Sequence, residues 1–297
     1  MKKPEKPNTR LKVAEAAELM AFLLLKLPQK NRNNVKTLLR DKHVWVEGRA
    51  QTQFNFGLLP NQEVEIRWNK NAVQQQYAGL TILFEDPHLV VIDKPEGLLS
   101  IATDNHETQT AYRILSDHVK RQNPANKIFV VHRLDRETSG VMVFAKNEKI
   151  KRLLQESWES TTKERTYLAI AEGRLQPSAG TVQSYLHESK TFLVYSSQNP
   201  NLGGQLATTH YETMQNNSEF TLLKVNLETG RKNQIRVHLQ DLGHSIIGDK
   251  KYGSTQNPIK RLGLHAWILA FTHPITNEQI RFETKMPSKF LGLLTKN

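Results

Sequence analysis

The segment Val130–Lys146 reads "VVHRLDRETSGVMVFAK" and places a cluster of charged residues between two apolar runs. Val130 and Val131 are typical of the end of a buried strand, and "GVMVFAK" is typical of the start of the next one. The residues between them, "LDRETS", therefore form a connection that buried structure holds at both ends. Asp135 lies on this connection, a kind of position where functional side chains are often found.

Asp135 has an arginine nearby on each side, Arg133 and Arg136, and positive neighbours stabilise the negative charge of a carboxylate. An ionised carboxylate in a fixed position can act as a nucleophile, as a base or as a stabiliser of positive charge. The same residues also suit a structural aspartate that caps the turn or pairs with Arg133. The local pattern leaves both interpretations open.

Short apolar runs dominate the chain from residue 80 onward, and only a few helical patterns lie between them. The runs are "LTILFED", "HLVVIDKP", "KIFVVH", "GVMVFAK", "RTYLAIAEG" and "FTLLKVNL". Helices do not separate these strands regularly, which argues against a doubly wound parallel sheet. We therefore predict an α+β fold for residues 80–297, with a mixed, mostly antiparallel sheet and flanking helices.

The first 70 residues form a smaller, strongly basic segment. They contain 14 lysines and arginines against 7 aspartates and glutamates, an excess of +7 out of the net +12 of the chain. A helical pattern precedes two alternating strands, "HVWVEG" and "EVEIRW", which predicts a small α/β domain over residues 1–70. The polar segment 71–79 lacks a clear period and is expected to be a linker.

Arg32, Lys36 and Arg40 follow one another at intervals of four and so share one face of the predicted helix. Val35, Leu38 and Leu39 form a separate, apolar face. Three cations in a basic domain are the pattern expected of contacts to a nucleic-acid backbone. The alternative is a solvated helix face with ordinary charges.

Several classes of protein lack their signatures here. The chain has no cysteine, which excludes disulfides and thiolate sites and fits a reducing, cytoplasmic compartment. Its apolar stretch Leu19–Leu27 is far shorter than the roughly 20 residues that span a bilayer, and no signal peptide is expected. No "HExxH", "GxGxxG" or "GxxxxGK[ST]" motif occurs, so we expect neither a metal nor a cofactor.

Five segments in order resemble motifs of the RluA family of RNA pseudouridine synthases. They are "VIDKPEGLLS", "HRLDRETSG", "KERTYLAIAEG", "TGRKNQIRVHLQDLGHSIIGDKKYG" and "LGLHAWILAFTHP", and they span about residues 80–285. The resemblance implies that the protein isomerises uridine in RNA to pseudouridine. Members of the family often carry an N-terminal S4 RNA-binding module, and the basic segment 1–70 occupies its place.

The resemblance also implies roles for single residues. The essential aspartate is Asp135, its arginine partner is Arg236, and the aromatic partner of the target base is Tyr167. Arg133 matches the residue that fills the gap left by the flipped nucleotide, and His132 beside it is expected to contact RNA as well. Whether Asp135 attacks C1′ or removes the 2′ proton stays open. One departure from the family pattern is the pair Lys232-Asn233, where many members have a hydroxyl residue followed by histidine.

The expected partner is RNA, ribosomal rather than transfer RNA, by analogy with large-subunit modifying members that carry an S4 module. Two other functions are compatible with parts of the sequence. One is an RNA-binding or ribosome-assembly factor that kept the fold and lost catalysis, which the joint presence of Asp135, Tyr167 and Arg236 disfavours. The other is a metal-dependent RNA hydrolase, which lacks the spacing of metal ligands.

Overall fold

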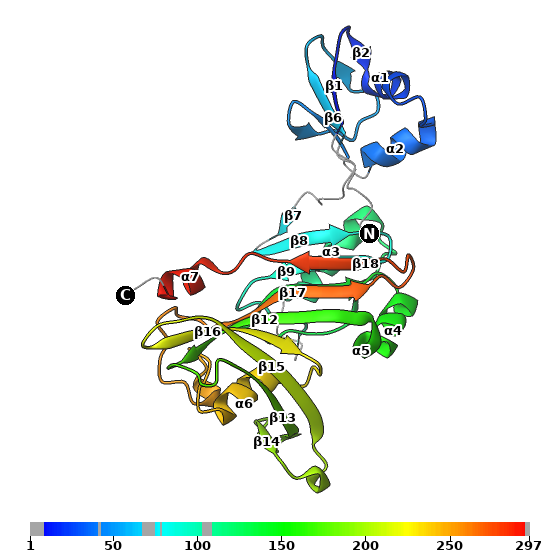
Figure 1. The fold of residues 1–297 in the computed structure, drawn as a ribbon. Coiled ribbons are helices and arrows are strands. Elements are labelled where there is room, and N and C mark those ends of the chain that lie inside the picture. The colour runs from blue at the N-terminus through cyan, green and yellow to red at the C-terminus, as the bar shows by residue number, and fades with distance from the viewer. Residues whose placement is uncertain (1–8, 41–42, 67–74, 78, 103–108, 295–297) are drawn as a thin grey trace. The chain divides into compact units, whose positions relative to one another are not determined.

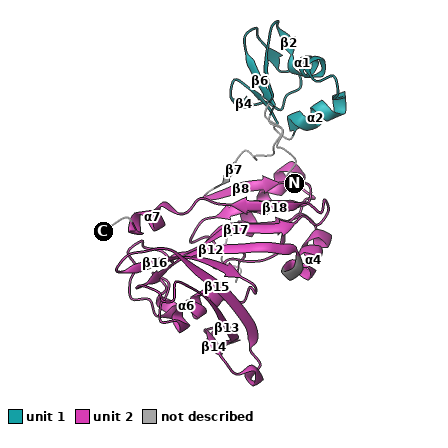
Figure 2. Ribbon diagram, viewed as in Figure 1, with its two compact units in different colours: residues 1–74 teal, residues 75–297 magenta. Residues whose placement is uncertain are grey.

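The computed structural model describes residues 9–40, 43–66, 75–77, 79–102 and 109–294. The chain divides into two units, with the boundary between residues 74 and 75 (Figure 2). Each unit has a hydrophobic core of its own. The larger unit contains Asp135 and the other residues of the predicted active site.

The N-terminal unit packs two helices against a small sheet. Its elements are β1 (Thr9–Lys12), β2 (Ala17–Glu18), α1 (Leu19–Lys26), α2 (Arg32–Arg40), β3 (Val44–Val46), β4 (Arg49–Ala50), β5 (Gly57–Leu58) and β6 (Glu63–Ile66). The sheet has the order β1-β6-β3-β4, and β2 pairs with β5. The sequence predicted both helices, β3 and β6, but not the short strands β1, β2, β4 and β5.

Helix α2 begins where Asn31 and Asn34 exchange hydrogen bonds, each side-chain oxygen accepting from the backbone N–H of the other at 2.9 and 3.1 Å. These bonds satisfy donors that a helix start leaves unpaired. Val35 and Leu39 are fully buried in the core of the unit, as the apolar stripe predicted. Arg32, Lys36 and Arg40 are exposed on an adjoining face of the helix.

The larger unit is built on one sheet of 12 strands within the described residues (Figure 1). Its main path runs β14-β13-β15-β16-β12-β17-β11-β9-β8-β7, with β10 paired to β11 and β18 paired to β17. The strands are β7 (Gln75–Tyr77), β8 (Leu80–Glu85), β9 (Leu89–Lys94), β10 (Phe129–Val130), β11 (Ser139–Ala145), β12 (Thr162–Glu172), β13 (Ala179–Glu188), β14 (Val194–Ser197), β15 (Gln205–Asn216), β16 (Phe220–Leu227), β17 (Leu264–Thr272) and β18 (Gln279–Glu283). The pair β11–β17 is parallel and the other paired strands are antiparallel, which confirms the predicted α+β class with a mixed, mostly antiparallel sheet.

Helices cover both faces of this sheet. They are α3 (Ala111–Gln122), α4 (Glu148–Glu156), α5 (Trp158–Thr161), α6 (Gln234–Asp241) and α7 (Ser288–Leu294), with the short turns η1 (Pro200–Leu202) and η2 (Lys250–Tyr252). Helix α3 packs on one face of β8, β9 and β11, and α4 packs on the other. Helix α6 and helix α7 cover opposite faces of β12 and β16. In the described part of the chain, no helix is long and apolar enough to cross a membrane.

The predicted linker 71–79 differs from the structure in its extent. Residues 71–74 and 78 lie outside the described residues, and Gln75–Tyr77 form strand β7 at the edge of the large sheet. The sequence of β7, two glutamines and one tyrosine, lacks the alternation of apolar and polar residues that predicts a strand. An edge strand needs only backbone pairing with one neighbour, which here is β8. The larger unit therefore starts before residue 80.

Strand β11 approaches β17 so closely that only glycine fits at position 140. Gly140 has φ +116°, in the region that favours glycine, and pairs with Ala266. A Cβ atom at this position would lie 2.0 Å from the carbonyl oxygen of Ala266. Because this contact lies five residues after Asp135, it fixes the end of the connection that carries the aspartate.

Replacing Gly140 with alanine should lower the free energy of unfolding by more than about 3 kcal/mol, since the substitution adds a backbone clash to a strained φ. Urea denaturation measures the change. The control is Gly203→Ala, where φ is +76° but a Cβ atom would meet nothing within 4 Å. This control should cost about 1 kcal/mol, the backbone strain alone. Equal effects of the two variants would show that the close approach of β11 and β17 is not limiting.

Candidate active site

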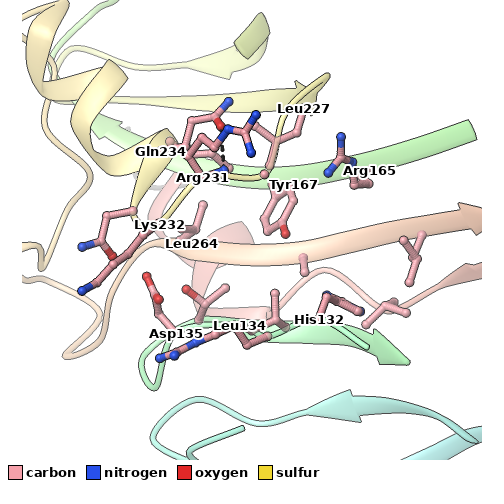
Figure 3. Close-up of a pocket in the computed structure, with 18 of the residues that line it drawn as sticks. His132, Leu134, Asp135, Arg165, Tyr167, Leu227, Arg231, Lys232, Gln234 and Leu264 are labelled. Atoms are coloured by element: carbon pink, nitrogen blue, oxygen red, sulfur yellow. Dashed lines mark hydrogen bonds between the residues drawn. The ribbon is translucent and has the colours of Figure 1, made fainter. Parts of the chain in front are cut away.

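Asp135, Tyr167 and Arg236 line one cavity of about 850 Å³ in the larger unit. Asp135 comes from the connection between β10 and β11, Tyr167 from β12 and Arg236 from α6. Figure 3 shows the Asp135 side chain and the Tyr167 ring pointing into the same space from opposite walls. The fold thus brings together three residues that are up to 101 positions apart in sequence.

The backbone around Asp135 is held from behind by the segment that follows β9. The Ser100 hydroxyl donates to the carbonyl of Leu134 at 2.7 Å and accepts from the Leu134 N–H at 3.2 Å. On the other side of Asp135, the carbonyl of Arg136 accepts from the Gly97 N–H at 2.8 Å. Both neighbours of the aspartate are therefore fixed, which gives its carboxylate a defined position.

Lys94 lies under this connection and is fully buried. Its ammonium donates to three backbone carbonyls, those of Pro95, Leu98 and Arg136, at 3.0, 2.6 and 3.3 Å. Burial lowers the pKa of Lys94 to about 8. The negative charges of Asp135 and Glu137 raise this pKa, but by less than burial lowers it. Lys94 therefore places a buried ammonium group behind the connection that carries Asp135.

Arg236 makes its strongest contact with Asp249 rather than with Asp135. Its Nε and Nη2 donate to the two oxygens of Asp249 at 2.6 and 2.8 Å, and the Asp249 side chain is 1% exposed. The contact with Asp135 is a single one, from Nη1 to Oδ2 at 3.3 Å. The sequence predicted the pairing of Arg236 with Asp135, but not the second carboxylate that occupies the planar fork of the guanidinium.

The position of Arg236 is fixed by further neighbours. Nη1 also donates to the side-chain oxygen of Asn233 at 3.0 Å, and the guanidinium lies 4.8 Å from the centre of the Tyr252 ring. Burial alone lowers the pKa of Arg236, but the hydrogen bonds and charge of Asp249, together with the charge of Asp135, outweigh burial and raise it. Arg236 is therefore a permanent cation beside Asp135.

Tyr167 is half-buried and packs against two hydrophobic clusters, one that includes residues of α3 and one that includes residues of α6. Its hydroxyl makes no hydrogen bond to another of the described residues. Burial raises the pKa of Tyr167 to about 12. The phenol therefore stays neutral at physiological pH and offers a ring face and a hydroxyl to whatever enters the cavity.

His132 and Arg133 lie beside Asp135 and also line the cavity. His132 is half-buried, whereas Arg133 is exposed and makes no hydrogen bond or ion pair within the described residues. Lys232 and Asn233, the departure from the family pattern, line the cavity as well, and Asn233 contacts Arg236. The predicted RNA-binding residues Arg32, Lys36 and Arg40 belong to the other unit.

Comparison with known proteins identifies the family of the chain. Residues 88–241, just over half of the chain, match the RNA pseudouridylate synthase family. The chain belongs to this family. It is 38% identical over 225 residues, 75% of the chain and 74% of the relative, to the uncharacterized RNA pseudouridine synthase YhcT of Bacillus subtilis. It is 33% identical to the ribosomal large subunit pseudouridine synthase D of Nitrosomonas europaea over 90% of the chain and 80% of the relative.

Among solved structures, the synthase resembles human RNA pseudouridylate synthase domain containing 4, with a TM-score of 0.58 and 27% identity. The match covers 71% of the chain and 90% of the human protein. These similarities confirm the prediction of an RluA-family RNA pseudouridine synthase. The chain is therefore an enzyme that isomerises uridine in RNA to pseudouridine.

Sequence reasoning missed two charged residues that shape the candidate active site, Lys94 and Asp249. Both lie inside motifs that were recognised, "VIDKPEGLLS" and "HSIIGDKKYG". The signal in the sequence was a charged residue within an otherwise apolar or glycine-rich motif. Such a residue is expected to be buried, and a buried charge needs a polar or charged partner. The identity of each partner depends on tertiary contacts that no local pattern contains.

Replacing Asp249 with asparagine should lower the free energy of unfolding of the synthase by about 3–5 kcal/mol, because the variant leaves the buried Arg236 without its bidentate partner. Chemical denaturation monitored by fluorescence measures the loss. The matched control is Asp117→Asn, which removes an exposed carboxylate 3.8 Å from Arg113 and should change stability by less than about 0.5 kcal/mol. A loss below 1 kcal/mol for the Asp249 variant would contradict the anchoring role of this pair.

Proposed function

We propose that Asp135 is the group that acts on the glycosidic bond of the target uridine, with Arg236 keeping it charged and Tyr167 holding the base. The observation that supports this assignment is the position of the Asp135 carboxylate, in one cavity with the neutral Tyr167 and 3.3 Å from the Arg236 cation. A carboxylate in this position stabilises or traps the positive charge that develops at C1′ when a glycosidic bond breaks.

The reaction needs the target base outside the RNA stack, because a stacked base cannot turn. Arg133 is suited to fill the vacated position, since an exposed planar guanidinium stacks on bases. Within the cavity the N1–C1′ bond breaks, the uracil turns and a C5–C1′ bond forms. C5 then loses its proton and N1 gains one, so that the product is an isomer of uridine.

Two routes are open to the Asp135 carboxylate. It can attack C1′ and form a covalent intermediate as the N1–C1′ bond breaks, or it can remove the 2′ proton so that uracil leaves and a glycal with a C1′–C2′ double bond remains. Deuterium at the 2′ position of the substrate distinguishes them, because only the second route breaks the bond to that hydrogen. A primary isotope effect on single-turnover conversion would assign the second route.

Tyr167 contributes a ring face for stacking on the uracil and a hydroxyl that lies near the base. Because burial keeps this hydroxyl protonated up to a pKa of about 12, a tyrosinate ion is not the base that removes the C5 proton at neutral pH. The neutral hydroxyl can still accept or relay that proton as it leaves. Its lack of a partner among the described residues fits a group reserved for the substrate.

Ribosomal RNA is the proposed substrate. Support comes from relatives named ribosomal large subunit pseudouridine synthase D, of which the one from Haemophilus influenzae is 29% identical over 90% of the chain. The N-terminal unit is proposed to be an S4-like RNA-binding module, which its two helices and its small sheet support. The cytoplasm is the expected compartment of such an enzyme.

The exposed cations Arg32, Lys36 and Arg40 are proposed to contact the RNA backbone. All three are exposed on one helix, on a face that adjoins the buried stripe of Val35 and Leu39. Backbone contacts of this kind position an enzyme on RNA without reading its sequence. Catalysis would then remain a property of the larger unit.

Replacing Asp135 with asparagine should abolish pseudouridine formation and leave RNA affinity within about threefold, since the amide keeps the shape but is a poor nucleophile and base. Pseudouridine mapping in RNA from cells without the gene, complemented with wild type or variant, measures the activity and names the uridine. Glu137→Gln, which removes an exposed carboxylate from the same connection, is the control and should complement. Complementation by the Asp135 variant would overturn the assignment.

Replacing Arg32, Lys36 and Arg40 with glutamine should weaken RNA binding and flatten its salt dependence. Each lost phosphate contact lowers the slope of log affinity against log salt by about 0.7–0.9, so three lost contacts lower it by about 2–3. Binding of the mapped RNA is measured at several salt concentrations, together with the single-turnover rate at saturating RNA. That rate should stay near normal.

The control for this triple variant replaces three exposed lysines that do not line the cavity, Lys260, Lys285 and Lys289. It loses the same charge and should keep most of the salt slope. An equal effect of both triple variants would mean that net charge alone, and no particular contact of α2, governs binding.

A further inference from the structure

The cavity continues beyond Asp135 and Tyr167 to His132, which the isomerisation does not use. The Nε2 atom of His132 accepts a hydrogen bond from the Val143 N–H at 3.1 Å. Strand β10 pairs with β11 only at residues 144 and 145, and β17 pairs with it only at residues 139 and 140. The Val143 N–H lies between these two pairings, and His132 supplies the acceptor that a neighbouring strand would otherwise provide.

This contact determines where His132 carries its proton. Burial, and then the positive charge of Arg165, lower the pKa of His132 to about 4, so the ring is neutral at physiological pH. A neutral ring that accepts at Nε2 must carry its proton on Nδ1. Within the described residues Nδ1 has no hydrogen-bond partner, and it is not one of the fully buried polar atoms. Since the two ring nitrogens point in diverging directions, the Nδ1–H is directed away from β11.

The ring of His132 is held in one orientation. It packs against Trp158 with ring centres 4.9 Å apart and planes inclined by 31°. The Gln155 amide donates to the carbonyl of Val131 at 2.9 Å and so fixes the backbone just before the histidine. A donor whose direction is fixed in advance costs little entropy when it binds a ligand.

Arg165 lies across the cavity from His132 (Figure 3). It precedes Tyr167 by two residues on β12, so the two side chains project from the same side of the strand, about 7 Å apart along it. Its guanidinium donates to the backbone carbonyl of Glu228, which ties it to the cavity wall. A fixed N–H donor and a guanidinium therefore border one end of the cavity, next to the position of the base.

We propose that His132 and Arg165 bind a phosphodiester group of the RNA adjacent to the target uridine. The inference rests on the proposed function, because it places the uracil on Tyr167. An N–H donor and a cation together match an anionic oxygen. The spacing from Tyr167 assigns the phosphate to the target nucleotide or its neighbour. Holding that phosphate fixes the ribose of the flipped nucleotide, so that C1′ is presented to Asp135.

The test uses the full chain and the dinucleoside monophosphates ApU and UpA, each compared with its uncharged methylphosphonate. Affinities are measured by NMR titration, with the His132 ring nitrogens as a direct probe. Wild type should bind ApU or UpA about tenfold more tightly than the corresponding methylphosphonate, and the preferred isomer tells on which side of the uridine the phosphate lies. Equal affinities for both phosphates and their analogues would overturn the proposal.

Two substitutions of His132 separate RNA binding from the structural contact with Val143. His132→Gln places a carbonyl near the position of Nε2 and lacks the Nδ1–H, so it should keep the melting temperature and lose the phosphate preference. His132→Asn places an amide near the position of Nδ1 and cannot reach Val143, so it should melt lower and keep the preference while folded. A His132→Gln variant that melts lower and keeps the phosphate preference would assign His132 a purely structural role and overturn the proposal.

Arg165→Gln should also lose the phosphate preference. If His132→Gln weakens the phosphates and the methylphosphonates equally, the donor binds a base carbonyl and the proposal is wrong. None of these measurements requires turnover. A failure of the proposed function, seen as pseudouridine formation by the Asp135→Asn variant, would therefore be distinguished from a failure of this phosphate site.

Discussion

One residue of β17, Ala266, pairs with Gly140 on one side and with Tyr167 on the other. Gly140 ends the connection that carries Asp135, so this single register point fixes the aspartate relative to the tyrosine. The approach on the Gly140 side is too close for any Cβ atom. Because β17 separates β11 from β12, the geometry of the candidate active site depends on how the sheet is assembled around Ala266.

The two cations near Asp135, Arg236 and Lys94, are fixed in position by hydrogen bonds to groups other than Asp135. Arg236 is anchored by Asp249, and Lys94 is anchored by three backbone carbonyls. Neither cation needs Asp135 as its main partner, and the Asp135 side chain, which lines the cavity, remains 28% exposed. Cations that are fixed in this way leave the carboxylate available to a substrate.

The sequence contained enough information to predict the class of the fold and the three residues that the cavity brings together. Apolar runs predicted β8, β9, β11, β12 and β16, because those strands are largely buried and periodicity follows burial. It did not predict β13 and β15, whose residues are mostly polar and partly exposed, so that their pairing leaves no apolar signature. The pairing of the Arg236 guanidinium with Asp249 could not be predicted for a different reason. It depends on how α6 packs against η2, and this tertiary contact leaves no local pattern in the sequence.

The signature "HRLDRE" places His132, Arg133 and Asp135 within four residues. His132 and Asp135 are half-buried and Arg133 is exposed, and this difference in burial decides the role of each side chain. His132 is packed against Trp158 and stays neutral, so it adds no third positive charge close to Asp135. Arg133 is charged but exposed, and solvent screens its effect on the carboxylate. Arg236, and not Arg133, donates a hydrogen bond to Asp135, so Arg133 can move onto RNA without breaking a hydrogen bond to the aspartate.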